Sequence, residues 1–157
     1  SLSEADFIDA NATPVLHAGV LYAASYSEGI FALEPKTGKI LWRRAAPAVT
    51  SLALGENQLF AGSADGYVWG LSLKEGKMEF RTRLAEGPVL GLQHSQGHLV
   101  LAGGGSGLIV LSAVNGAPVQ ATSLGSRAAS APAISRSEIA LLTANGYLYS
   151  FSSRNPN

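Results

Sequence analysis

An internal repeat of roughly 40 residues constrains the fold more than any other feature of the sequence, because such a period is typical of solenoids and propellers. Aligned positions are separated by 38, 40 and 40 residues. The same offsets hold at several landmarks, so chance similarity is a poor explanation. The aligned columns are Tyr22, Phe60, Val100 and Ala140; Leu33, Leu71, Leu111 and Phe151; and Gly38, Gly76 and Gly116.

Each repeat is predicted to contain four short strands. In the first repeat, apolar runs at 13–17, 20–25, 29–34 and 39–43 are separated by turn signals. Between the first two strands lie Gly19, Asn57 and Gly97, where a tight hairpin needs a residue that accepts a positive φ. No stretch combines a 3.6-residue period with helix caps, so no significant helix is expected.

These patterns predict an all-β fold, a β-propeller of about four four-stranded blades. The repeats run approximately over 12–48, 49–87, 88–127 and 128–154, and the last repeat lacks the turn and the fourth strand of the others. Open strand edges are therefore expected, and they favour self-association, most simply as a homodimer. Residues 1–10 are a candidate donor of the missing strand.

Composition excludes several classes of function. The chain has no cysteine, which rules out a disulfide framework, a thiolate zinc site and a cysteine nucleophile. Eleven basic and eleven acidic residues give a net charge of zero, so no general attraction to nucleic acid is expected. No apolar run approaches the roughly 18 residues of a membrane span. The acidic opening Ser1–Asp6 is unlike a signal peptide, which indicates either a protein that is not exported or a mature piece of a longer one.

Two motifs resemble ligand sites but have simpler interpretations. His94 and His98 have the i, i+4 spacing of a metal pair, but they flank a predicted hairpin and no third ligand is evident. The run Gly103–Gly107 matches no phosphate-binding fingerprint and is not followed by a helix, so a turn is expected there. No metal, cofactor or catalytic residue is predicted.

Aromatic residues recur at one position of the repeat, at Trp42 and Phe80, and this recurrence favours packing between blades. Gly38, Gly76, Gly116, Trp42 and Phe80 are therefore interpreted as structural repeat positions. The fourth strands end in Arg43, Arg44, Arg81 and Arg83, which are expected to form a solvated rim.

The first repeat, GVLYAASYSEGIFALEPKTGKILW, closely resembles the repeat of quinoprotein-like propellers, whose blades end in Ala-Leu-Asp-x-x-Thr-Gly-x-x-x-Trp. Here that tail runs from Ala32 through Thr37-Gly38 to Trp42. The opening Asp9–Val15 resembles the Asp-x-Asp-x-Thr-Pro segment of BamB-type proteins, although Asn11 replaces the second acid. The ending Asn145–Phe151 resembles the last BamB blade.

This resemblance implies the C-terminal half of an eight-bladed propeller at the periplasmic face of the outer membrane, in a full-length protein that is a lipoprotein. It implies a non-catalytic scaffold that assists outer-membrane β-barrel assembly by binding the periplasmic domains of BamA. Asp6, Asp9 and Asn11 are then candidate partner-binding residues, or ordinary turn residues. The alternatives are a fragment of a quinone-dependent dehydrogenase, which needs a Ca²⁺ site, and a ligand-sensing extracellular propeller.

Overall fold

A computed structural model describes residues 12–84, 87–103, 105 and 107–152, and every regular element among these residues is a β-strand. The strands form separate antiparallel sheets in which each strand pairs with the next one in the sequence. The strands are β1 (Val15–His17), β2 (Val20–Ser25), β3 (Gly29–Leu33), β4 (Ile40–Arg44), β5 (Val49–Leu54), β6 (Gln58–Ser63), β7 (Tyr67–Ser72), β8 (Met78–Arg83), β9 (Val89–Ser95), β10 (His98–Gly103), β11 (Gly107–Ser112), β12 (Pro118–Ser123), β13 (Ala133–Ile134), β14 (Glu138–Leu142) and β15 (Leu148–Ser152).

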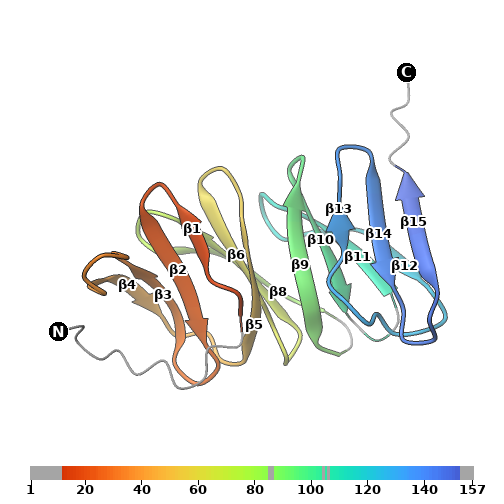
Figure 1. Ribbon diagram of the computed structural model, residues 1–157, viewed down its shortest axis with the longest axis horizontal. Helices are drawn as coiled ribbons and strands as arrows, with labels where there is room; N and C mark the ends of the chain where they lie inside the picture. Colours follow the sequence, from red (N-terminus) through yellow and green to blue (C-terminus); the bar gives the residue numbers. More distant parts are fainter. Residues whose placement is uncertain (1–11, 85–86, 104, 106, 153–157) are drawn as a thin grey trace.

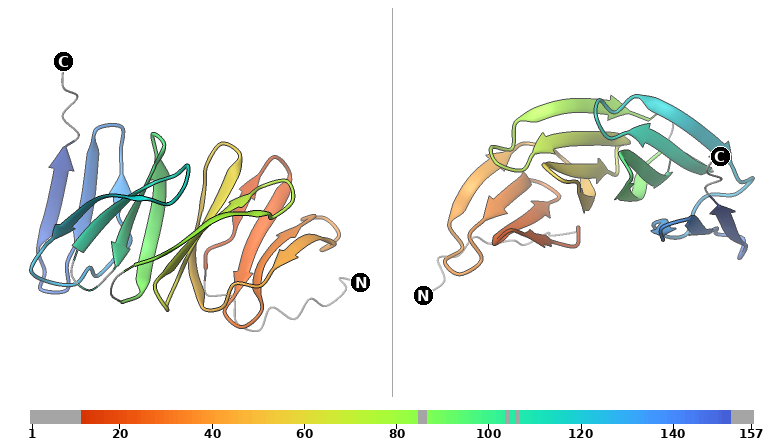
Figure 2. Two further views of the ribbon diagram at one scale, coloured as in Figure 1. Left: turned by 180° about the vertical axis from the view of Figure 1, so that it is seen from behind. Right: turned by 90° about the horizontal axis from the view of Figure 1, so that it is seen from above.

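The sheets are the blades of a β-propeller, which confirms the predicted fold class. Blade 1 is β1–β4, blade 2 is β5–β8, blade 3 is β9–β12, and blade 4 contains β13–β15 among the described residues. The blades stand in sequence order along the molecule (Figure 1) and trace an arc when seen from above (Figure 2). The first strands line the concave side of the arc, and the fourth strands lie on its convex side.

The strand register repeats from blade to blade. The second and third strands pair Leu21 with Leu33, and the equivalent pairs follow in the later blades. The fourth strand carries a bulge at the same place in blades 1, 2 and 3. The equivalent pairs are Leu59 with Leu71, Leu99 with Leu111, and Ile139 with Phe151.

The turn before the fourth strand is also repeated. The amide of Gly38 donates to the Glu34 carbonyl, and the equivalent bonds from Gly76 and Gly116 have the same length of 2.9 Å. These hydrogen bonds explain why β3 stops at Leu33 and why β4 starts after Lys39, one residue later than predicted on that side. Lys39 belongs to the turn, since its carbonyl accepts a hydrogen bond from the Glu34 amide.

The hairpins between the first two strands are not all alike. Ala18-Gly19 and Gln96-Gly97 have positive φ at both residues, which is the geometry of a two-residue type I′ turn. Asn57 does not have a positive φ, so the expectation for that residue is wrong. The turn in blade 2 is closed by the Gly55 amide donating to the Gln58 carbonyl, which spaces the strands without a left-handed residue.

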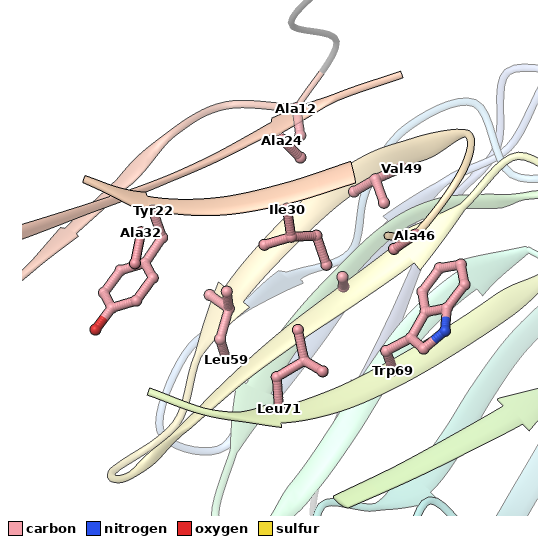
Figure 3. Packing of buried hydrophobic residues seen from close by; sticks show 11 residues of the cluster. Ala12, Tyr22, Ala24, Ile30, Ala32, Ala46, Val49, Leu59, Trp69 and Leu71 are labelled. Carbon is pink, nitrogen blue, oxygen red and sulfur yellow. The ribbon is translucent and has the colours of Figure 1, made fainter. Parts of the chain in front are cut away.

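The core lies between the blades rather than within one sheet. Tyr22, Ile30 and Ala32 of blade 1 face Leu59 and Trp69 of blade 2 (Figure 3). Similar clusters fill the boundaries between blades 2 and 3 and between blades 3 and 4. Burial of both sheet faces explains the nearly continuous apolar runs of the second strands.

Candidate functional site

Three grooves open between successive blades, and their linings come from equivalent positions of the repeat. Groove 1 lies between blades 1 and 2, with a volume of about 340 Å³. Groove 2, between blades 2 and 3, has about 400 Å³, and groove 3, between blades 3 and 4, has about 240 Å³. Residues of the first hairpin, the second strand and the fourth strand of one blade contribute to each groove, together with the first hairpin of the next blade.

Groove 1 has an aromatic wall. The rings of Tyr22 and Trp42 lie 5.9 Å apart at 46°. The Tyr22 hydroxyl and the Trp42 Nε1–H both donate to the carbonyl of Leu73 in blade 2, at 3.2 and 2.9 Å. Burial raises the pKa of Tyr22, so this hydroxyl stays a donor at neutral pH. The two rings are therefore held rigidly while part of the Trp42 surface stays open to the groove.

Exposed apolar side chains extend this wall. Leu41 lines groove 1 beside Trp42 and is 50% exposed, and Val20 adds a further apolar residue to the lining. The polar residues His17, Glu56 and Lys74 also line groove 1. A lining that combines aromatic, aliphatic and charged residues has the composition of a protein-binding patch.

Groove 2 has the same position in the fold but a polar lining. Glu79 occupies the place of Leu41, and it accepts a hydrogen bond from the Gln58 amide group, which replaces Val20. His94 stacks on Phe60 with a centroid distance of 5.5 Å. This groove is therefore internally hydrogen-bonded, and it offers a partner less apolar surface than groove 1 does.

Ring-on-glycine contacts join blade 1 to blade 2 and blade 2 to blade 3. A Cβ atom on Gly76 would lie 2.5 Å from the Trp42 ring, and one on Gly116 would lie 2.4 Å from the Phe80 ring. Both glycines have positive φ. Thus Trp42 contacts Gly76, and Phe80 contacts Gly116, across the boundary between two blades. Gly38, the remaining structural repeat position, has open space beside it.

At groove 3 the aromatic residue is replaced by Gln120, whose amide nitrogen bonds Thr122 of its own strand at 3.3 Å. Valines and isoleucines from blades 3 and 4 line the rest of this groove, alongside Arg136 and Glu138. The apolar residues are Val100, Val110, Val119, Ile134 and Ile139.

A larger hollow of about 490 Å³ lies against the concave side, between strands β1, β5 and β9. In its lining, the Thr50 hydroxyl links blade 2 to blade 3 by donating a hydrogen bond to the Val89 carbonyl at 2.8 Å. The other polar residues of its lining are Thr13, Ser51, Gln93 and His94, and the lining contains no Asp, Glu, Lys or Arg. This lining gives no cluster of groups suited to catalysis.

The histidine pair does not form a site. His94 stacks on Phe60 of blade 2, whereas His98 faces groove 3 and its Nδ1 lies 2.9 Å from the Gln96 carbonyl. The two rings thus lie on opposite faces of blade 3. Within the described ranges, no group of three or more His, Asp or Glu residues is arranged to hold a metal ion.

The partner-binding candidates Asp6, Asp9 and Asn11 lie outside the described residues. No helix among the described residues is long and apolar enough to span a membrane. Sequence reasoning missed groove 1. The available signal was the change from Val20 and Leu41 in the first repeat to Gln58 and Glu79 at the equivalent places of the second.

Comparison with known proteins gives matches at the level of family and fold. Residues 2–95 match the family described as outer membrane protein assembly factor BamB. The BamB protein of Legionella pneumophila (strain Paris) is 23% identical over 142 residues, which cover 90% of this chain and 37% of that protein. The chain therefore spans less than half the length of this relative.

Two solved structures share the fold. The BamB structure from Moraxella catarrhalis superimposes with a TM-score of 0.80 at 17% identity, over 92% of this chain and 46% of that one. The computationally designed protein Ika4 gives a TM-score of 0.83 at 16% identity and covers 97% of this chain and 95% of its own.

Proposed function

The chain belongs to the family of the outer membrane protein assembly factor BamB, and from this premise we propose that it is a non-catalytic scaffold that binds the periplasmic domains of BamA. In this role it assists the assembly of outer-membrane β-barrel proteins at the periplasmic face of that membrane, as part of a lipoprotein. The family match over residues 2–95 is the observation that carries the proposal.

Groove 1 is the surface best suited to such a partner. Its aromatic residues are fixed before binding by two hydrogen bonds to Leu73, so little side-chain entropy is lost when a partner docks. The exposed Leu41 beside them offers apolar area that a partner side chain would cover. In this proposal, an apolar side chain of BamA enters groove 1 and polar groups pair at its rim.

A calorimetric titration with the periplasmic domains of BamA tests the proposal. Wild-type chain should bind, and Leu41→Glu, which introduces the residue that groove 2 already has, should weaken binding about tenfold because it buries a charge against apolar surface. Met78→Glu is the matched control, since Met78 is an exposed apolar residue of blade 2 outside groove 1. Absence of binding by the wild type, or equal binding by both variants, would contradict the proposal.

The N-terminal acidic segment supplies a second contact in this proposal. Charge reversal at Asp9 should weaken BamA binding without lowering the melting temperature. The motivation is the match of Asp9 to the first acid of the BamB segment. Unchanged affinity would leave Asp9 as a turn residue.

The absence of catalysis is part of the same proposal, against the dehydrogenase alternative. With added quinone cofactor and Ca²⁺, the chain should oxidise neither alcohols nor sugars in a dye-reduction assay. Reproducible dye reduction above a heat-denatured control would favour the enzyme.

Self-association is a further element. The outward face of blade 4 exposes Leu142 and Leu148, the latter to 70%. A second copy could cover this surface and give a homodimer. Sedimentation at micromolar concentration should therefore detect a dimer that Leu148→Glu weakens, and a strict monomer would rule it out.

A further inference from the structure

Blade 2 carries a cationic cluster that none of the grooves uses. Tyr67 and Trp69 lie on β7, and their cross-strand partners on β8 are Arg83 and Arg81. The guanidinium carbons of Arg81 and Arg83 lie 4.9 and 5.7 Å from the centre of the Tyr67 ring. Two positive charges therefore share one aromatic ring, at distances where cation–π attraction operates.

This ring has a fixed position. Tyr67 packs against the core between blades 1 and 2, and its ring lies 5.7 Å from that of Trp69, which is 5% exposed. The arginines themselves are exposed. The sheet thus presents two exposed guanidinium groups that lie against the packed ring of Tyr67.

Neither arginine is neutralised within the described part of the chain. The one ion pair there joins Arg43 to Glu28 at 3.6 Å, and no hydrogen bond to the guanidinium groups of Arg81 or Arg83 is present. Like charges on one face of a strand repel, so an anion placed between the two guanidinium groups would be bound favourably. Each guanidinium also has a fork of donors suited to a carboxylate.

Blade 1 shows the neutralised version of the same arrangement. Arg43 is equivalent to Arg81 and lies 5.3 Å from the Phe31 ring, where Phe31 is equivalent to Trp69. Its counter-ion Glu28 aligns with Gly66, so blade 2 has lost the carboxylate while gaining a second arginine. Blade 3 has neither arginine, since Ala121 and Ser123 stand at these positions.

From this contrast we propose that Tyr67, Arg81 and Arg83 form a docking surface for an acidic, extended segment of a protein partner. The spacing selects the partner chemistry. Arg81 and Arg83 are two residues apart on one strand, so their Cα atoms are separated by roughly 7 Å and their side chains leave the same face. Two acidic residues at i and i+2 of an extended peptide have the same separation and the same facing. Each carboxylate then pairs with one guanidinium.

The protein class of this partner rests on the proposed scaffold function, whereas the anion-binding chemistry rests on the cluster alone. Tyr67 and Trp69 pack toward blade 1, and β8, which carries Arg81 and Arg83, is the fourth strand of blade 2 and lies on the convex side of the arc (Figure 2). It is made of residues distinct from those of groove 1. Binding of an acidic segment there does not require groove 1 to be filled.

The test is fluorescence anisotropy with a labelled seven-residue peptide that has two glutamates two residues apart among threonines. Wild-type chain should bind this peptide at low ionic strength and lose affinity as salt rises. Arg81→Gln and Arg83→Gln should each reduce affinity at least about fivefold. Arg43→Gln is the matched control and should change affinity less than about twofold, since Arg43 already has a counter-ion. Thermal melts of the variants verify folding.

Two further probes make the result decisive. The same peptide with glutamines should bind at least about fivefold more weakly, and so should one with adjacent glutamates, whose side chains point to opposite sides. Equal binding of the three peptides, or equal loss in Arg43→Gln, would overturn the proposal. So would arginine-dependent binding of phosphatidylglycerol vesicles with no peptide binding, because it would identify a lipid site. BamA is absent from these assays, so their failure is distinct from failure of the BamA titration.

Discussion

The boundary between blades 1 and 2 and the boundary between blades 3 and 4 are built on the same strand register but are closed differently. At the first boundary, Trp42 lies over Gly76 and hydrogen-bonds Leu73 of the next blade. At the second, Gln120 occupies the ring position and bonds only within its own strand. The backbone therefore sets where a contact between blades forms, and the side chain at one repeat position sets whether it is made.

The glycine is as important as the ring in this contact. Gly76 accepts the Trp42 ring because it has no Cβ, and its carbonyl accepts a hydrogen bond from the Arg44 Nε. At the next boundary the Thr82 hydroxyl plays the equivalent part and donates to the Gly116 carbonyl at 2.8 Å. The contact is thus a small unit of ring, glycine and one polar donor, and it is present between blades 1 and 2 and between blades 2 and 3.

The largest expected effect is that of Gly76→Val. The new Cβ would lie 2.5 Å from the Trp42 ring, and a β-branched residue would have to adopt a φ of +60°. Overpacking and left-handed strain together should lower the free energy of unfolding by about 3–5 kcal/mol. Chemical denaturation measures this change.

Gly38→Val is the control for this prediction. Gly38 has a φ of +71° but nothing within 4 Å of its added Cβ, so only the backbone strain should apply, about 1–2 kcal/mol. Equal destabilisation by the two substitutions would show that the ring contact contributes nothing.

The second-largest expected effect on stability is that of removing the Trp42 ring. Trp42→Ala should destabilise the fold by about 3 kcal/mol, since it removes aromatic area and a hydrogen bond to Leu73. Gln120→Ala, at the equivalent position, should change stability by less than about 0.5 kcal/mol because Gln120 is exposed. Similar melting temperatures for the two variants would contradict the difference between the boundaries.

The smallest expected effect is a gain. Gln120→Phe restores the aromatic residue of the repeat beside the apolar lining of groove 3, which includes Val100 and Ile139. Filling this groove should raise stability by about 0.5–1 kcal/mol. A decrease on thermal melting would show that the groove does not accept the ring without its glycine partner.

Much of the fold was predictable from the sequence because its signals repeat. The column of Leu33, Leu71, Leu111 and Phe151 gave the register that the sheets have, and it did so because each leucine pairs across the second and third strands in the same way. The prediction of a positive φ at Asn57 was wrong, because asparagine tolerates a positive φ but does not require one. The end of β3 and the start of β4 each differ by one residue from the prediction, because Glu34 and Lys39 form hydrogen bonds in the turn.

The candidate site was less predictable. Groove 1 depends on how Leu41, Trp42 and the next blade's Leu73 come together, and a sequence shows such contacts only after the register is known. The Arg81 and Arg83 cluster was visible as charge, but its anchoring on Tyr67 and its missing counter-ion required the cross-strand register. The arginine content alone does not distinguish a solvated rim from a docking surface.

Hydrogen–deuterium exchange of the chain, alone and with the periplasmic domains of BamA, tests the scaffold function most directly. Docking at groove 1 predicts protection of residues 17–22, 41–42, 56–57 and 73–74, the segments that line it, with little change over the outer face of blade 4. Protection should be lost in Leu41→Glu and kept in Met78→Glu. Unchanged exchange over groove 1 at saturating BamA, or protection that Leu41→Glu leaves intact, would contradict BamA binding through this groove.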